Sequence, residues 1–336
     1  MKKFGILAAA VALLAVAAIA LFHIHESAAD RLVVKLESGP PQPKVSPGEA
    51  GMDLAAIQLA VDYAGKRNTS ALVIGRNGHV VFEKYWGDTT LDTEVSDNDF
   101  AAPFAALLIG SAMNDRLSVN LDEPLSTYLP EYAGATTGTK SLRQLLGGQS
   151  SGVTPPTELA ALVLERVTRQ PFEILVTERL WKPMGGGDLS FRRNTSNDLR
   201  HGAATAGCCV TASIGDWMRV GELLANDGVF EGNQVTPPRY VTFMLTPTHK
   251  GAGTAFGVNV DDRFAAHDVA WLSGARKQRL WVVPSLRLVI LRVGDEPDTA
   301  DGWDESMIPD SIIRGTSGWH PKSVGKDVDP NKYAPH

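Results

Sequence analysis

The stretch from Ser96 to Leu117, SDNDFAAPFAALLIGSAMNDRL, constrains the fold of this chain more than any other. An apolar run follows a polar turn and is itself followed by the acidic, proline-bearing phrase LDEPLSTYLPEY. A helix that is apolar on all sides has to be buried inside a larger protein. The stretch therefore predicts a buried helix, with Asp99 as its N-cap and Pro103 tolerated in its first turn.

The composition is that of an ordinary globular protein and does not by itself indicate a function. The chain has 336 residues, of which 43% are hydrophobic, and a formal net charge of −6. This length suffices for one large domain or two small ones with an ample core. The sequence has no basic stripe, so we expect no nucleic-acid partner.

The N-terminus predicts export. Two lysines precede an unbroken apolar run from Gly5 to Phe22, which is just long enough to cross a bilayer as a helix. The lysines would stay inside and the remainder of the chain would face out. We expect residues 1–26 to anchor a single-pass inner-membrane protein with a periplasmic domain. The alternative is a signal peptide cleaved near Ala28 and Ala29, which would leave a secreted or soluble periplasmic protein.

The two cysteines of the chain, Cys208 and Cys209, are adjacent. Neighbours cannot form a long-range staple with each other, and a disulfide ring closed between them would be strained. We therefore expect buried free thiols. A redox or metal-binding role lacks partners at ligand spacing. Neither cysteine lies near the N-terminal apolar run, so a lipoprotein anchor is excluded.

The first part of the chain after the apolar run predicts a linker, a helix and a hairpin. Residues 27–52 are polar and proline-bearing, which suits a linker that lifts a domain off the membrane. Apolar residues at helical spacing follow over Asp53–Lys66. The runs SALVIGR and HVVFEKYWG are rich in β-formers and are joined across Asn77-Gly78, a strong hairpin signal.

The C-terminal part predicts further strands and a closing helix. Four apolar runs, FGVNV, VAWLSG, QRLWVVP and LRLVILRVG, are separated by short turns and have the pattern of strands. Asp304–Arg314 can form a closing helix. We expect residues 315–336 to be a flexible tail, so the folded domain should span residues 53–314.

Several phrases resemble the serine β-lactamase and penicillin-binding-protein superfamily, in its β-lactamase-related, class C-like serine hydrolase branch. The phrase after the buried helix has the form Asp-x-Pro-x-x-x-Tyr-Leu-Pro, and SLRQLLGGQSSG resembles a landmark of paired leucines followed by Ser-Gly. The segment from His201 to Val241 resembles the branch in its Asp-Trp turn, amphipathic helix and Asn-Asp-Gly ending. The resemblance implies an α/β (α+β) fold, in which an antiparallel sheet is flanked by N- and C-terminal helices. It also implies an inserted helical subdomain at about residues 100–245.

The resemblance implies a catalytic set that this chain lacks. The family opens its buried helix with a serine and a lysine, spaced S-x-x-K, and these positions fall on Asp99 and Ala102 here. A carboxylate is a poor replacement for a hydroxyl nucleophile, and alanine cannot take a proton. The loop that carries the family's tyrosine is reduced to Val153–Glu158. The third motif, K-T-G or H-x-G, corresponds to Leu272-Ser273-Gly274, where Ser273 and Gly274 remain and leucine replaces the basic residue.

Other literal matches do not supply the missing chemistry. S-D-N at residues 96–98 precedes the buried helix, S-x-x-K at 323–326 lies in the polar tail, and H-x-G at 249–251 lies in a turn. We expect no cofactor and no metal because the histidines lack metal-ligand spacing. These histidines include His79, His201, His249, His267 and His320.

We therefore expect an exported, catalytically inactive homologue of these hydrolases. Its remnant cleft would bind a small-molecule or peptidoglycan-like ligand of the cell envelope, and its N-terminal helix would contact the membrane. The alternative is an active esterase, amidase or β-lactamase with a rearranged nucleophile, for which Ser273, Ser150 and Ser151 are the candidates. A purely structural envelope protein is a third hypothesis, since fold does not determine function.

Overall fold

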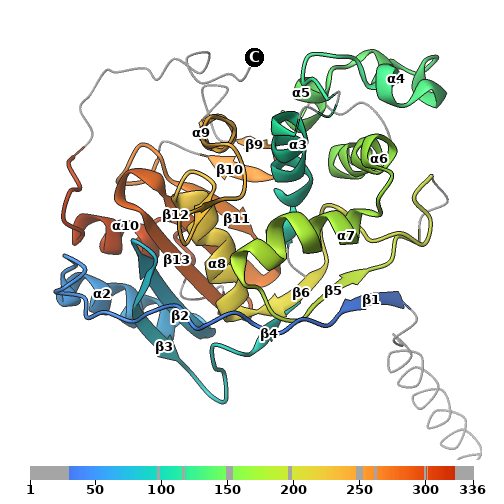
Figure 1. Ribbon diagram of the computed structural model, residues 1–336. Helices are drawn as coiled ribbons and strands as arrows, with labels where there is room; N and C mark the ends of the chain where they lie inside the picture. Colours follow the sequence, from blue (N-terminus) through green and yellow to red (C-terminus); the bar gives the residue numbers. More distant parts are fainter. Residues whose placement is uncertain are drawn as a thin grey trace, which may run out of the picture.

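A seven-stranded antiparallel sheet forms the centre of the computed structural model, with helices on both faces (Figure 1). This is the α/β fold with a flanked antiparallel sheet that the resemblance implied. The structure describes residues 30–96, 99–115, 117, 119–148, 154–195, 199–246, 253–260, 263–298, 300 and 302–321.

The strands of this sheet are in the order β3-β2-β13-β12-β11-β10-β9. The predicted hairpin is confirmed: Asn77 and Gly78 have φ of 51° and 80°, as a tight turn between twisted strands requires. The four C-terminal runs also form strands as predicted. The strand bounds are β2 (Thr69–Arg76), β3 (His79–Tyr85), β9 (Gly253–Ala255), β10 (Val258–Val260), β11 (Ala270–Ser273), β12 (Arg279–Val283) and β13 (Leu288–Gly294).

The two terminal helices of the domain cover one face of the sheet. These are α2 (Leu54–Gly65), whose Asp53 N-cap accepts a hydrogen bond from the amide of Ala55, and α10 (Met307–Arg314). Leu288 and Ile290 of β13 point into this layer, while Val289 and Leu291 point into the layer on the other face. This alternation follows from the two-residue period of a strand and divides the core into two layers.

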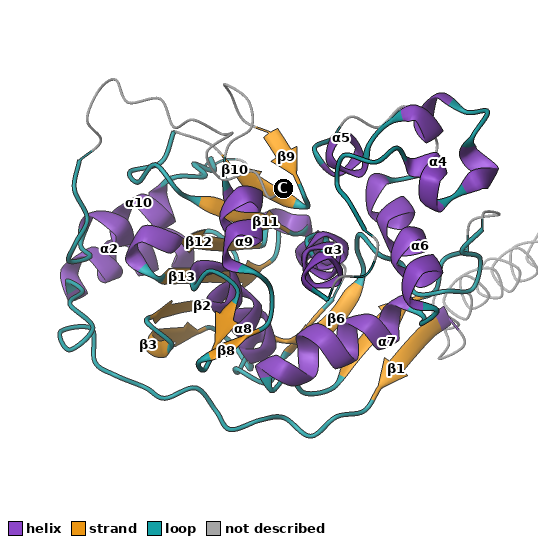
Figure 2. Ribbon diagram, turned by 45° about the horizontal axis from the view of Figure 1, so that its top comes forward, coloured by secondary structure: helices purple, strands orange, loops and turns teal. Residues whose placement is uncertain are grey.

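The other face of the sheet is covered by α8 (Ile214–Ala225). The Ser213 hydroxyl caps this helix by accepting a hydrogen bond of 3.0 Å from the amide of Asp216. The predicted apolar face is buried, because Trp217, Val220, Leu223 and Leu224 are each fully inaccessible to solvent. Figure 2 shows α3 (Phe104–Asn114), α6 (Pro156–Thr168) and α7 (Phe172–Val176) on the opposite side of the sheet from α2 and α10.

Part of the expected linker belongs to the folded domain instead. A second sheet has the order β1-β5-β6-β4, and its edge strand is β1 (Arg31–Val34). β1 pairs antiparallel with β5, and its side chains alternate as in a strand: Leu32 and Val34 pack against the core, whereas Val33 is 55% exposed. The other strands are β4 (Glu94–Val95), β5 (Leu189–Arg192) and β6 (Val210–Ser213), and a separate hairpin consists of β7 (Val229–Phe230) and β8 (Asn233–Gln234).

The remaining helices form the layer next to α8. Two of them, α6 and α7, follow each other along the chain, and the second continues through a wide turn and a 3₁₀ turn to Met184. The helix bounds are α3 (Phe104–Asn114), α4 (Leu125–Tyr128), α5 (Leu142–Leu146), α6 (Pro156–Thr168), α7 (Phe172–Val176) and α9 (Pro238–Leu245).

The predicted buried helix is α3, but it begins later than expected. Its residues from Phe104 to Gly110 are all buried, which confirms the burial inferred from the apolar run. The prediction that Asp99 caps this helix is wrong: the N-cap is Pro103, and no side chain caps the helix. Proline disfavours the helical conformation in the residue before it, so the helix cannot extend back through Ala102. Asp99 lies instead in a separate 3₁₀ turn, η2 (Asp99–Ala101).

The predicted anchor at residues 1–26 lies outside the described residues. Of the helices that the structure does describe, none is long and apolar enough to span a bilayer. The first part of the expected tail is folded, because Thr316 pairs with Met52 and is 4% exposed, and the indole nitrogen of Trp319 donates to the carbonyl of Ala265.

Candidate functional site

A cleft of about 440 Å³ lies where the helical layer meets the edge of the large sheet. Six segments line it: the chain just before α3, the start of α6, the loop between β5 and β6, the turn between β9 and β10, β10 itself, and the end of β11. The described lining residues are Ala102, Pro155, Thr157, Glu158, Gly207, Cys208, Gly257, Asn259 and Ser273. The structure therefore brings together Ala102 and Ser273, two of the positions singled out in the sequence.

Ser273 is held by an amide side chain on the neighbouring strand. Asn259 and Trp271 are partners in the register of β10 and β11, and this places Asn259 beside Ser273. The Asn259 side-chain nitrogen donates to the Ser273 hydroxyl at 3.0 Å and to the Trp271 carbonyl at 3.2 Å. Ser273 is half-buried. Because an amide NH₂ group has no proton-accepting lone pair, this contact orients the hydroxyl without deprotonating it.

The turn between β9 and β10 lies directly against Ala102, to which the resemblance assigns the family's lysine position. Gly257 has a φ of 77°, and a Cβ atom there would lie 2.3 Å from both the carbonyl carbon and the carbonyl oxygen of Ala102. The turn is held from the other side, because the amide of Phe256 donates to the carbonyl of Leu146 at 2.6 Å. The backbones of residues 102 and 257 are therefore in contact, and a side chain at 257 would have no room.

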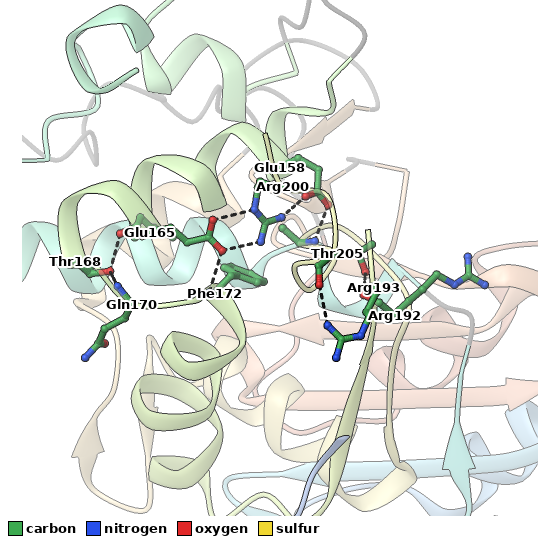
Figure 3. Close-up of polar contacts among 12 residues, drawn as sticks. Glu158, Glu165, Thr168, Gln170, Phe172, Arg192, Arg193, Arg200 and Thr205 are labelled. Carbon is green, nitrogen blue, oxygen red and sulfur yellow. Dashed lines mark hydrogen bonds and ion pairs between the residues drawn. The ribbon is translucent and has the colours of Figure 1, made fainter. Parts of the chain in front are cut away.

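A buried ion cluster holds one wall of the cleft. Figure 3 shows Arg200 between Glu158 and Glu165, two carboxylates of α6. Arg200 is only 3% exposed. Its guanidinium donates hydrogen bonds of 3.0 and 3.2 Å to the Glu165 carboxylate and a further hydrogen bond to Glu158. Burial alone would lower the pKa of Arg200, but the hydrogen bonds and charges of Glu165 and Glu158 outweigh it and leave this pKa raised. Both carboxyl groups of the cluster therefore have the Arg200 guanidinium as a hydrogen-bond partner.

The loop between β5 and β6 is fastened to this cluster. The second oxygen of Glu158 accepts a hydrogen bond of 2.6 Å from the amide of Ala206. The Thr205 hydroxyl, labelled in Figure 3, bonds the carbonyls of Arg192 and Cys208 at 3.2 and 3.1 Å. These hydrogen bonds fix the part of the loop from Thr205 to Cys208, which presents Cys208 to the cleft.

The expectation of buried free thiols is wrong. Cys208 and Cys209 form a disulfide with each other, and both residues are half-buried. Cys209 has a φ of 68°, and this left-handed conformation turns the chain so that two neighbouring side chains can meet. Periodicity and spacing give no signal for such a local turn, which is why the sequence did not predict it.

Several residues singled out in the sequence cannot be placed in the cleft. Ser150, Ser151 and His249 lie outside the described residues. Only the backbone of Asp99 is described, within a 3₁₀ turn that lies beside β11. Gly274 follows β11, and its amide donates to the carbonyl of Gln278 at 2.8 Å. In the part of the chain that the structure describes, no group of three or more His, Cys, Asp or Glu residues is arranged to hold a metal ion.

The family model described as Beta-lactamase matches residues 54–293, which is most of the chain. The chain belongs to the beta-lactamase family. No curated protein sequence matches it.

Several solved structures share the fold of this family member. A candidate 6-aminohexanoate-dimer hydrolase from Bacillus anthracis has a TM-score of 0.65 and 16% identity, over 80% of this chain and 87% of that one. A penicillin-binding protein homologue from Caulobacter crescentus has a TM-score of 0.60 and 14% identity, over 77% and 94%. A family VIII carboxylesterase has a TM-score of 0.61 and 14% identity, over 77% and 96%. At these identities the likeness shows the fold alone.

The described lining of the cleft in this beta-lactamase family member contributes hydroxyl, amide and carboxylate side chains. Within the described part of the lining there is no lysine, histidine or tyrosine to serve as a base. The one carboxylate in that part, Glu158, is occupied by Arg200 and by the amide of Ala206. Sequence reasoning missed Glu158, Arg200 and Asn259. Of these three, only Asn259 has a signal in the sequence. The alternation in FGVNV sets it on the opposite face of its strand from the valines.

Proposed function

We propose that this beta-lactamase family member no longer performs acyl transfer, and that its cleft binds a small, peptidoglycan-like ligand of the cell envelope. The observation that carries the proposal is Ala102, which lines the cleft at the position to which the resemblance assigns the lysine. An alanine there can take no proton from a nucleophile. The cleft itself, at about 440 Å³ with both apolar and hydrogen-bonding groups in its lining, has the size and chemistry of a small-molecule site.

The loss of acyl transfer can be tested with covalent probes. We expect no stoichiometric adduct when the full chain is incubated with a labelled penicillin or a fluorophosphonate and examined by intact-mass spectrometry. An active serine hydrolase from the same preparation conditions serves as the positive control. Stoichiometric acylation of any serine would overturn the proposal, whichever serine carries it.

The second candidate function is hydrolysis with Ser273 as a rearranged nucleophile. It is favoured by one observation, the hydrogen bond from Asn259 to the Ser273 oxygen, which leaves the hydroxyl proton free to be donated elsewhere. In that case acylation should map to Ser273 and should disappear in the Ser273→Ala variant. Hydrolysis without acylation of Ser273 would contradict this candidate.

Ligand binding can be tested by thermal unfolding in the presence of soluble peptidoglycan fragments. A ligand at a hundred times its dissociation constant stabilises the folded state by about 2.7 kcal/mol. We expect such a shift for the unmodified chain and a smaller one for Ala102→Trp, which fills the cleft. Ala135→Trp, at an exposed alanine, is the matched control and should bind as the unmodified chain does. The absence of a shift with every fragment would count against the binding role.

We also propose that the protein is exported and remains anchored. The apolar run from Gly5 to Phe22 after two lysines supports this proposal, because its length suits a bilayer span. Cell fractionation of the full chain should recover it in the membrane fraction with its N-terminus intact. Recovery of a soluble form that begins after residue 26 would favour a cleaved signal peptide instead.

A further inference from the structure

We propose that the Cys208–Cys209 disulfide is a separate reactive centre of the cleft, a thiol–disulfide exchange site that is modified by a low-molecular-weight thiol. This inference goes beyond ligand binding and does not require the ligand of the proposed function. It concerns the one covalent linkage in the described lining that a nucleophile can open without a base or a metal.

The disulfide does not act as a staple. A cross-link stabilises a protein mainly by closing a loop in the unfolded chain, and the effect grows with the length of that loop. Cys208 and Cys209 are one residue apart, so their disulfide closes no such loop. The tertiary hold on this segment comes instead from hydrogen bonds, those of Ala206 to Glu158 and of Thr205 to Arg192.

The position of the disulfide makes one sulfur the expected target. Cys208 lines the cleft together with Ala102, Thr157 and Ser273, and it is half-buried. Cys209 carries the left-handed backbone and its carbonyl accepts a hydrogen bond from the amide of Arg192, on the side of β5. A thiol that enters the cleft therefore meets Cys208 first, and access determines which sulfur is attacked.

The exchange step is balanced without any further reagent. The incoming thiolate forms a bond to the Cys208 sulfur, the bond between Cys208 and Cys209 breaks, and Cys209 leaves as a thiolate. The product is a mixed disulfide on Cys208. In the reverse step the Cys209 thiolate attacks the Cys208 sulfur and expels the small thiol. A second thiol can instead attack the mixed disulfide, which releases an oxidised thiol dimer and leaves both cysteines reduced.

The surrounding contacts favour reversibility. The loop is held by Glu158, Arg192 and the Thr205 hydroxyl, and none of these hydrogen bonds uses a sulfur atom. The two cysteines therefore stay next to each other when the disulfide opens. Ring closure from the mixed disulfide is intramolecular and needs no oxidant, because the Cys209 thiolate expels the small thiol, so removal of that thiol should restore the disulfide from the adduct.

The test uses the full chain and reduced glutathione. After brief incubation and quenching with iodoacetamide, mass spectrometry should find one glutathione per chain on Cys208 and an alkylated Cys209. After removal of glutathione without quenching, the adduct should disappear and the disulfide should return. Failure to detect either the adduct or the reduced pair, under conditions in which glutathione reduces a small-molecule disulfide, would overturn the proposal. An adduct on Cys209 alone would overturn the assignment of the attacked sulfur.

Two further comparisons test whether the thiol arrives through the cleft. Ala102→Trp should slow adduct formation about tenfold, since access limits exchange, while Ala135→Trp should leave the rate unchanged. A bulky thiol, reduced coenzyme A, should form the adduct more slowly than 2-mercaptoethanol does. For this comparison, each rate is divided by the rate at which the same thiol reacts with a small-molecule disulfide. Equal rates in the folded Ala102→Trp variant, or equal corrected rates for the two thiols, would contradict the route. Because no envelope ligand is present, these results stand or fall independently of the binding experiments.

Discussion

Gly110 lies at a position where the packing of the core leaves no room for a side chain. It lies inside α3, where alanine would be the better helix former, yet a Cβ atom there would lie 2.5 Å from the ring of Tyr240. Tyr240 is 2% exposed and has no room to withdraw. We expect Gly110→Ala to lower the free energy of unfolding by about 2–3 kcal/mol, because overpacking outweighs the gain in helix propensity. Urea denaturation followed by circular dichroism measures the change.

Gly134 provides the matched control for this prediction. It lies in an exposed loop, without a positive φ, and a Cβ atom there would have no neighbour within 4 Å. Gly134→Ala should therefore be neutral or stabilising by less than about 1 kcal/mol. If Gly110→Ala were as harmless as Gly134→Ala, the close packing of α3 on Tyr240 would be wrong.

Glu222 is the residue whose burial should be visible in the pH dependence of stability. Burial, assisted by the negative charge of Glu231, raises the pKa of Glu222 from 4.5 to about 6, although Gln42, Arg219 and His79 oppose the change. The folded state therefore binds more protons than the unfolded state between these values, and stability falls as the pH rises through that window. The shift corresponds to about 2 kcal/mol at pH 7.5.

The Glu222→Gln variant removes this charge while keeping the shape of the side chain. We expect it to be more stable than the unmodified chain by up to about 2 kcal/mol at pH 7.5 and equally stable below pH 4.5. Urea denaturation at several pH values gives both numbers. Glu37 is exposed, so the difference in stability between Glu37→Gln and the unmodified chain should not change with pH in this way. A Glu222→Gln variant that is destabilised at high pH would mean that the carboxylate is favourably paired.

At the scale of elements, Arg200 is what joins α6 to the loop that forms the wall of the cleft. Replacing it by methionine would leave Glu158 and Glu165 without their cation, and Glu158 is 8% exposed. We expect Arg200→Met to cost about 3–5 kcal/mol of unfolding free energy. Hydrogen exchange should also quicken at the amide of Ala206, which donates to Glu158, before it quickens in the sheet.

The control for this prediction is an arginine on α6, the helix that carries Glu158 and Glu165. Arg166 pairs with Glu131, and its side chain is 48% exposed. Because exposed ion pairs contribute little, Arg166→Met should cost less than about 1 kcal/mol. Equal costs for the two variants would show that the cluster around Arg200 does not hold the loop.

Elements with a strong local signal could be predicted from the sequence, and the others could not. The Asn77-Gly78 turn and the apolar face of α8 were predicted because turn chemistry and periodicity act within a few residues. The start of α3 was predicted too early, since Asp99 offers a good cap but Pro103 excludes the preceding turn from the helix. β1 was missed because its partner, β5, is distant in the sequence.

At the scale of the whole molecule, the cleft was predictable in outline and not in its contacts. The family resemblance led to Ala102 and Ser273, and the fold brings both to one cleft. The resemblance did not indicate that Asn259 is the hydrogen-bond partner of Ser273, or that Glu158 supports the loop with the disulfide. Such pairings depend on strand register and on helix placement across the domain, and no local pattern encodes them.

The closure of the domain by its C-terminal segment gives a last prediction. The guanidinium of Arg76 donates to the Ser317 carbonyl at 2.7 Å and to its hydroxyl at 3.0 Å, and the Trp319 indole bonds the Ala265 carbonyl. Removing residues 315–336 should therefore cost about 3 kcal/mol or more, through lost hydrogen bonds and exposed apolar surface. Removing only residues 322–336 leaves these contacts intact and should have little effect. Denaturation of the two truncated chains compares them directly, and equal stability would show that the folded domain ends at Arg314.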